Sequence, residues 1–144
     1  MNRRLADLSS IMRPRVYELL ALLVERGIHG MIVETLRSPE DQRRYLAAGR
    51  SATTLSRHLA RRLRMEMPPD HPDAEKADAM DWAPYEIYAS QGPDKLQWSA
   101  SAPEWQIFGA IAESLGFVWG GRWQQPHDPG HIELPRGIWA KEII

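Results

Sequence analysis

The chain has 144 residues, of which 43% are hydrophobic and 26% charged, and its formal net charge is -1. This length suits one domain with a buried core, and the near-zero charge gives no electrostatic reason to expect nucleic acid or an anionic membrane as a partner. Cysteine is absent, so disulfides and thiolate zinc ligands are excluded, and any metal must be held by histidine and carboxylate. No apolar run reaches the ~20 residues that span a bilayer. The polar start does not have the pattern of a signal peptide core, so we expect synthesis in the cytoplasm.

The N-terminal third predicts a helix, a strand and a second helix. Apolar residues at helical spacing from Val16 to Leu23 indicate a helix over 11–26, with capping serines before it and Gly27 after it. The run GMIVETL is rich in β-formers and predicts a strand over 31–36. In SPEDQRRYLAAG, a serine N-cap, a proline at the first helical position and a final glycine predict a helix over 38–49.

The middle of the chain predicts loop structure. RSATTLSRH looks like a loop, and HLARRLRMEM could form a short basic helix, but the prolines of MPPDHPDAEKAD break any regular element. We therefore expect an insertion or flap at about 59–76. The basic run is expected to be a solvated helix face, with binding of acidic wall polymer as the alternative; its arginines are Arg57, Arg61, Arg62 and Arg64.

The C-terminal half predicts short strands around one amphipathic helix. AMDWAPY suits a buried strand ending at Pro84, and the irregular stretch after it has a turn signal at Gly92 and Pro93. PEWQIFGAIAESLG places its apolar residues on one stripe and stops at Gly116, while FVWGGRW and HIEL read as short strands. The order of these elements predicts a single α+β domain over 1–144, with helices packed on a small antiparallel sheet.

Three short motifs, SRH, AMDW and DPGHIEL, place a histidine or an aspartate at the edge of a predicted strand. A catalytic zinc site uses three protein ligands and leaves the fourth position for water, and strand edges hold ligands rigidly. In this chain the ligands must come from the carboxylates and from the five histidines, which are His29, His58, His71, His127 and His131.

The motifs TLRSPEDQ, GRS, SRH, DAMDWAPY and DPGHIEL, in that order, resemble the M15-type zinc peptidases of cell-wall metabolism. That group contains D-alanyl-D-alanine peptidases and the L-alanyl-D-glutamate peptidase endolysins of tailed phages, and the last two motifs are especially similar to the endolysins. The resemblance covers roughly residues 30–134 and implies a hedgehog/DD-peptidase-like fold. It implies that one zinc ion is bound by His58, Asp81 and His131. It also implies that Asp128 is the base that activates water and that Arg37 is a partner for the polarised carbonyl.

The spacing of the first two implied ligands departs from the family pattern H-x-x-G-x-A-x-D. Here 22 residues lie between His58 and Asp81, and Ala77 stands where the glycine would be. The insertion at about 59–76 accounts for this spacing. It also offers other candidates for the first ligand, namely Asp70, His71, Asp73 and Asp78. We prefer His58, because SRH keeps the serine of the motif and WAPY still follows the aspartate.

Other residues near these motifs have predicted roles. Ser56 of SRH and Trp123 are predicted to contact substrate, with Trp119 as a second tryptophan flanking the site. Gly130 is expected to let the backbone turn sharply, so that the base and the last ligand face one metal. His127 is interpreted as a bystander.

The sequence therefore predicts a zinc-dependent peptidase that cleaves the peptidoglycan stem peptide. The preferred bond is L-alanyl-D-glutamate, with release from the cytoplasm by a holin and action as a monomer. A D-alanyl-D-alanine carboxypeptidase or dipeptidase is the alternative enzyme. A non-catalytic wall-binding or phage structural module is the alternative from another class. Two histidines and one aspartate would also accept other divalent metals.

Overall fold

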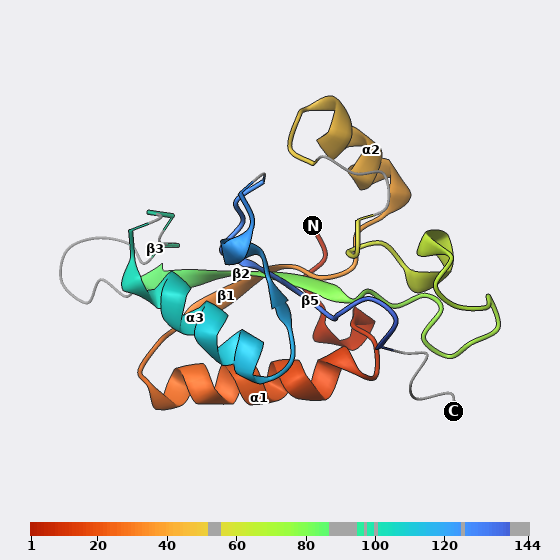
Figure 1. The fold of residues 1–144 in the computed structure, drawn as a ribbon. Coiled ribbons are helices and arrows are strands. Elements are labelled where there is room, and N and C mark those ends of the chain that lie inside the picture. Colours follow the sequence, from red (N-terminus) through yellow and green to blue (C-terminus); the bar gives the residue numbers. More distant parts are fainter. Residues whose placement is uncertain (52–55, 87–94, 97, 100, 125, 139–144) are drawn as a thin grey trace.

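The computed structural model describes residues 1–51, 56–86, 95–96, 98–99, 101–124 and 126–138. Within these ranges one antiparallel sheet runs through the centre of the molecule (Figure 1), in the order β1-β2-β5-β4, with β3 paired to β2. Its strands are β1 Gly30–Glu34, β2 Ala79–Glu86, β3 Lys95–Leu96, β4 Val118–Trp119 and β5 His131–Glu133. The predicted α+β fold class is confirmed.

Two helices, α1 Met12–Glu25 and α3 Pro103–Ser114, contact each other and join the sheet in one apolar core. The ring of Trp82 on β2 stacks on that of Phe108 on α3, with centroids 4.4 Å apart. This apolar burial is the main favourable contribution to the stability of the fold. The third helix, α2 Pro39–Ala47, lies apart from the other two (Figure 1).

The predicted helix signals are largely confirmed. Ser38 caps α2, where its Oγ accepts a hydrogen bond from the Asp41 N–H at 3.1 Å. Gly27, Gly49 and Gly116 follow the three helices with φ between +71° and +88°, a left-handed conformation that glycine adopts without strain. Ser9, one of the serines expected to cap α1, has two hydrogen-bond partners. Its Oγ accepts from Met12 N–H at 3.4 Å and donates to Asp78 at 2.6 Å. This serine therefore links α1 to a buried carboxylate.

The short 3-10 helices are η1 Leu5–Asp7, η2 Arg61–Arg64 and η3 Gly120–Arg122. The short strand β3 was not predicted, and the turn predicted at Gly92 and Pro93 lies outside the described residues. In the described part of the chain, no helix has the length and apolar character to cross a membrane.

Segment 59–76 differs from the predicted solvated helix face. Only η2 is helical there, and Arg57, Arg61 and Arg64 are 4%, 0% and 7% exposed. The expectation of solvated arginines is therefore wrong for these three, whereas Arg62 is exposed. The physical reason is a fully buried carboxylate, Asp78, which accepts hydrogen bonds from Arg61 Nη2 at 2.9 Å and Arg64 Nη2 at 2.7 Å. The segment packs against the domain, and its origin as an insertion stays a prediction.

Candidate metal and catalytic site

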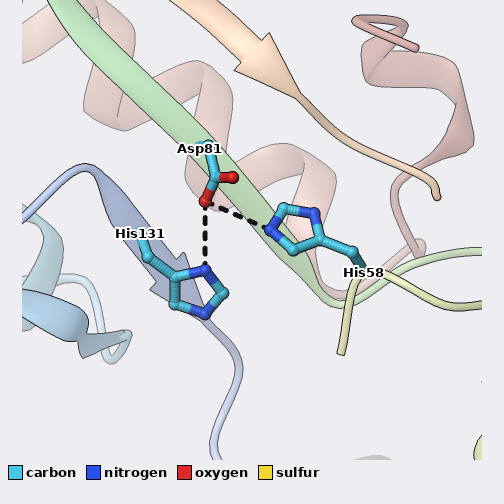
Figure 2. A group of neighbouring side chains, drawn as sticks. All are labelled: His58, Asp81 and His131. Carbon is cyan, nitrogen blue, oxygen red and sulfur yellow. Dashed lines mark hydrogen bonds and ion pairs between the residues drawn. The ribbon is translucent and has the colours of Figure 1, made fainter. Parts of the chain in front are cut away.

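Three side chains from separate parts of the chain meet at the sheet (Figure 2). Asp81 Oδ1 lies 3.1 Å from His58 Nε2 and 3.1 Å from His131 Nδ1. The three potential ligand atoms lie within 4.8 Å of one another. Antiparallel pairing of β2 with β5 places Asp81 directly opposite His131. The loop that precedes segment 59–76 supplies His58.

The ring of His58 is oriented by the end of β1. Its Nδ1 lies 2.6 Å from the backbone oxygen of Thr35, which can only accept a hydrogen bond. Nδ1 therefore donates to Thr35 O, and this hydrogen bond directs Nε2 toward Asp81. The backbone is fixed as well, because Arg37 N–H donates to His58 O at 2.8 Å. The ring is 2% exposed, so few other orientations are open to it.

His131 lies between two carboxylates. Its Nδ1 faces Asp81, and its Nε2 lies 2.9 Å from Glu133 Oε1. Burial alone would lower the pKa of His131, but hydrogen bonds to the two carboxylates outweigh burial and raise that pKa to about 10. Burial likewise would raise the pKa of Asp81, but the charges and hydrogen bonds of His58 and His131 hold it well below its usual range. The site therefore favours a positive charge next to Asp81.

The donor set fits a zinc ion. Two imidazole nitrogens and one carboxylate oxygen match the three-ligand arrangement of catalytic zinc sites. Each histidine also has its other ring nitrogen held by an acceptor, Thr35 O or Glu133 Oε1, which fixes the tautomer and the ring plane. The residues present could therefore hold one divalent ion.

The other residues predicted for the site line the same pocket, which has a volume of about 680 Å³. Together with the three potential ligands, it is lined by Arg37, Ser56, Trp123 and Asp128. The ring centroid of Trp123 lies 5.0 Å from that of His131. Ser56 Oγ accepts a hydrogen bond from the His58 N–H at 3.2 Å. The fold thus brings the predicted ligands and these four residues to one pocket.

Asp128 belongs to a loop that folds back beside the three potential ligands. Its N–H donates to Gly120 O at 3.1 Å, and its carbonyl oxygen accepts from His131 N–H at 3.1 Å. Burial and the charge of Asp81 raise the pKa of the Asp128 carboxyl, against the opposing charges of the two histidines and Arg37. A carboxyl group of raised pKa beside a cation site is suited to accept and return a proton.

The glycines of this loop are required by close backbone approach. A Cβ on Gly130 would lie 2.4 Å from Trp82 O, and a Cβ on Gly120 would lie 2.3 Å from Asp128 O. The backbone does turn here as expected, since residues 129 and 130 form a turn closed by the hydrogen bond from His131 N–H to Asp128 O. Gly130 does not have a positive φ, however, so the turn by itself does not require glycine. It is a glycine because the loop lies directly on β2, where Trp82 N–H donates to Gly130 O at 2.9 Å.

Arg37 is held by several acceptors at the wall of the pocket. Its Nε and Nη2 donate to Glu34 Oε1, and its Nη1 donates to Gln42 Oε1 at 2.7 Å. The guanidinium also lies over the ring of Tyr45, 4.6 Å from the centroid. An immobilised cation of this kind can stabilise a developing oxyanion.

Two acidic residues next to the site were missed in the sequence. Glu34 is 2% exposed and orients Arg37, and its presence in the apolar run GMIVETL was the available signal. Glu133 contacts His131 from two positions further along β5. Side chains two apart on a strand share a face, so the spacing in HIEL was its signal.

The alternative first ligands lie elsewhere. His71 Nδ1 accepts from Asp73 N–H at 3.0 Å, the Asp73 carboxylate accepts from Ser10 N–H at 3.1 Å, and Asp78 is bound to arginines. His29 and His127 are exposed. Trp119 is buried and donates from Nε1 to Pro129 O at 2.8 Å, so it holds the loop and does not line the pocket.

Comparison with known proteins agrees with this geometry. Residues 76–134 match a peptidase family model described as D-alanyl-D-alanine carboxypeptidase. The crystal structure of the L-Ala D-Glu endopeptidase ChiX of Serratia marcescens has a similar fold. Its TM-score is 0.58 at 22% identity, over 91% of this chain and 83% of that chain. No curated protein sequence matches the chain. The family model confirms the resemblance to M15-type peptidases over these residues, and the structural match shows a similar fold.

Proposed function

We propose that the protein is a zinc-dependent peptidoglycan peptidase that cleaves the stem peptide. One observation carries this proposal: His58, Asp81 and His131 present a three-ligand group to a pocket that Asp128 and Arg37 also line. A ligand group alone would suit a structural ion. A carboxyl group of raised pKa and a fixed guanidinium beside it are the additional groups that peptide hydrolysis needs.

In this proposal each residue has one task. A bound zinc ion would lower the pKa of a water molecule and polarise the scissile carbonyl. Asp128 accepts the proton of the attacking water and returns it to the leaving amine. Arg37 stands by the carbonyl oxygen and stabilises its negative charge as the tetrahedral state forms. Ser56 and Trp123 contact the peptide at the pocket wall.

We propose the L-alanyl-D-glutamate bond as the one that is cleaved. The similar fold of an L-Ala D-Glu endopeptidase and the endolysin-like motifs DWAPY and DPGHIEL support this choice. The second candidate is D-alanyl-D-alanine carboxypeptidase activity, which the description of the matching family model favours. Holin-dependent release and action as a monomer stay predictions.

Digestion of purified peptidoglycan by the zinc-loaded protein tests the proposal, with fragments identified by mass spectrometry. New amino termini on D-glutamate are expected, and they should be lost in Asp128→Ala but kept in Asp70→Ala, a matched change at an exposed position. Release of D-alanine would instead establish the second candidate. Bound zinc with neither product would contradict catalysis and leave a wall-binding or phage structural module.

A further inference from the structure

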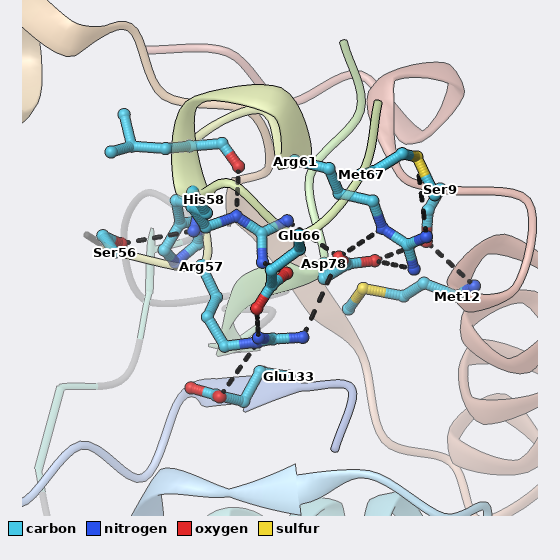
Figure 3. A network of polar contacts seen from close by, with 12 residues as sticks. Ser9, Met12, Ser56, Arg57, His58, Arg61, Glu66, Met67, Asp78 and Glu133 are labelled. Atoms are coloured by element: carbon cyan, nitrogen blue, oxygen red, sulfur yellow. Dashed lines mark hydrogen bonds and ion pairs between the residues drawn. The ribbon is translucent and has the colours of Figure 1, made fainter. Parts of the chain in front are cut away.

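Segment 59–76 contributes to a buried network of charges that leads to one of the proposed zinc ligands (Figure 3). The network contains three arginines and three carboxylates, which balance in charge: Arg57, Arg61, Arg64, Glu66, Asp78 and Glu133. Four of these six residues are 7% exposed or less. Buried charges must be paired, so the position of each group depends on the others.

The contacts form a path from the segment to the site. Glu66 Oε1 accepts a hydrogen bond from Arg57 Nη1, and Arg57 Nε lies 3.2 Å from Glu133 Oε2. The other oxygen of Glu133 lies 2.9 Å from His131 Nε2. Arg57 thus has a carboxylate on either side, one from the segment and one next to the proposed ligand. Its Nη2 lies 3.8 Å from Asp78, beyond hydrogen-bond distance.

The segment also holds Glu66 in place. Arg64 donates to the second oxygen of Glu66 and, through Nε, to Leu59 O at 2.9 Å. Met65, which directly precedes Glu66, has a φ of +59° and is 91% exposed. A left-handed conformation is unfavourable for methionine. Backbone hydrogen bonds from Met65 N–H to Arg62 O and from Glu66 N–H to Arg61 O, each 3.3 Å, hold this turn, which brings Glu66 back toward Arg57.

We propose that Glu66 is a positioning residue for zinc: through Arg57 it fixes the Glu133 carboxylate that orients the ring of His131. Without the charge of Glu66, Arg57 is free to turn toward Asp78. Glu133 then loses its partner and holds the imidazole less firmly. Partners that orient a metal-bound histidine typically contribute a factor of about 10 to 100 in metal affinity. This inference rests on the proposed zinc site.

The test is zinc affinity, measured by competition with a chromophoric chelator, in Glu66→Gln. The matched control is Glu75→Gln, the same change in the same segment at an exposed residue that pairs with Arg62. Glu66→Gln should bind zinc about 10-fold or more weakly, and Glu75→Gln should bind it like the wild type. Unfolding of the metal-free variants is followed in parallel. A lower unfolding temperature for Glu66→Gln with wild-type zinc affinity would overturn the inference, because the residue would then be only structural.

A second variant keeps the test decisive if Glu66→Gln does not fold. Arg57→Lys keeps the positive charge but replaces the planar guanidinium, whose Nη1 and Nε face Glu66 and Glu133 in a fixed geometry, with a flexible ammonium. It should also lower zinc affinity about 10-fold, and an unchanged affinity would overturn the inference. Failure of the wild-type chain to bind zinc would be a different result, because it would contradict the proposed function itself.

Discussion

Glu34 on β1 stands opposite Asp81 on β2 in the register of the sheet. Residues opposite each other on antiparallel strands project to the same face. This cross-strand pair therefore contains both Glu34, the carboxylate that orients Arg37, and Asp81, the carboxylate between the two histidines. The register shifts between Ile32 and Glu34, and such an irregularity re-aims a side chain, as is common beside active sites.

Neutralising Glu34 should impair catalysis while leaving zinc bound. In Glu34→Gln the guanidinium of Arg37 loses its ion pair and its fixed direction, so kcat should fall about tenfold, equivalent to ~1.4 kcal/mol. Arg37→Gln removes the cation and should lower kcat by about 10²–10³. Steady-state kinetics on a synthetic stem peptide measures both. Glu40→Gln, at an exposed glutamate of α2, is the control, and a wild-type kcat in Glu34→Gln would contradict this role.

Asp128→Asn should remove the proton acceptor and leave the metal group intact. We expect kcat to fall by about 10²–10⁴, with the zinc content of the purified protein unchanged. Kinetics combined with metal analysis separates these two effects. Loss of zinc in this variant would show that Asp128 is a ligand, and a wild-type rate would exclude it as the base.

Zinc should stabilise the folded chain. An ion that binds only the native state contributes about 4 kcal/mol at a concentration 1,000 times its Kd, which corresponds to a rise in Tm of roughly 10 °C for a chain of this size. Thermal unfolding with zinc and with chelator measures the difference. His131→Ala should abolish it, whereas His127→Ala, at an exposed histidine, should keep it. An equal response in the two variants would argue against the assigned ligand.

The buried contacts of Asp78 with Arg61 and Arg64 should make the stability of the fold depend on pH. Burial alone would raise the pKa of Asp78, but hydrogen bonds and charges of Arg61 and Arg64 outweigh burial and hold it below the ordinary value of 3.8. The folded state therefore binds the Asp78 proton less readily than the unfolded state does. The resulting stabilisation is present above pH 3.8 and is lost as the pH falls through the lower folded pKa.

Urea unfolding of the metal-free protein tests this dependence. Asp78→Asn should lose about 3–5 kcal/mol at neutral pH, because it leaves two buried arginines without their carboxylate. The difference between wild type and variant should shrink below pH 4. A difference that is constant from pH 7 to pH 3 would mean that the charge of Asp78 is not what stabilises the fold.

The parts of the fold that could be predicted are those with local signals. Ser38 marks the start of a helix by a side-chain hydrogen bond within one turn, and Gly49 and Gly116 mark helix ends by their left-handed backbone conformation. The structure confirms all three. The site residues were found through short motifs, and strand pairing then placed Asp81 opposite His131. The roles of these residues remain proposals.

The parts that could not be predicted depend on tertiary contacts. A buried arginine and a solvated one look alike in a basic run. The buried ones contact Asp78 and Glu66, and the sequence does not show which arginines lie close to these carboxylates. The reason for Gly130 is similarly remote, since it lies in the backbone oxygen of Trp82 on another strand.

The most direct test of the central claim is a zinc titration of the metal-free protein, with hydrolysis of a synthetic stem peptide measured at each step. We predict that the rate rises in proportion to added zinc and levels off at one ion per chain. His131→Ala should show neither tight binding nor activity. Full activity of the metal-free protein, or one tightly bound zinc ion without hydrolysis of stem peptides or peptidoglycan, would contradict the account.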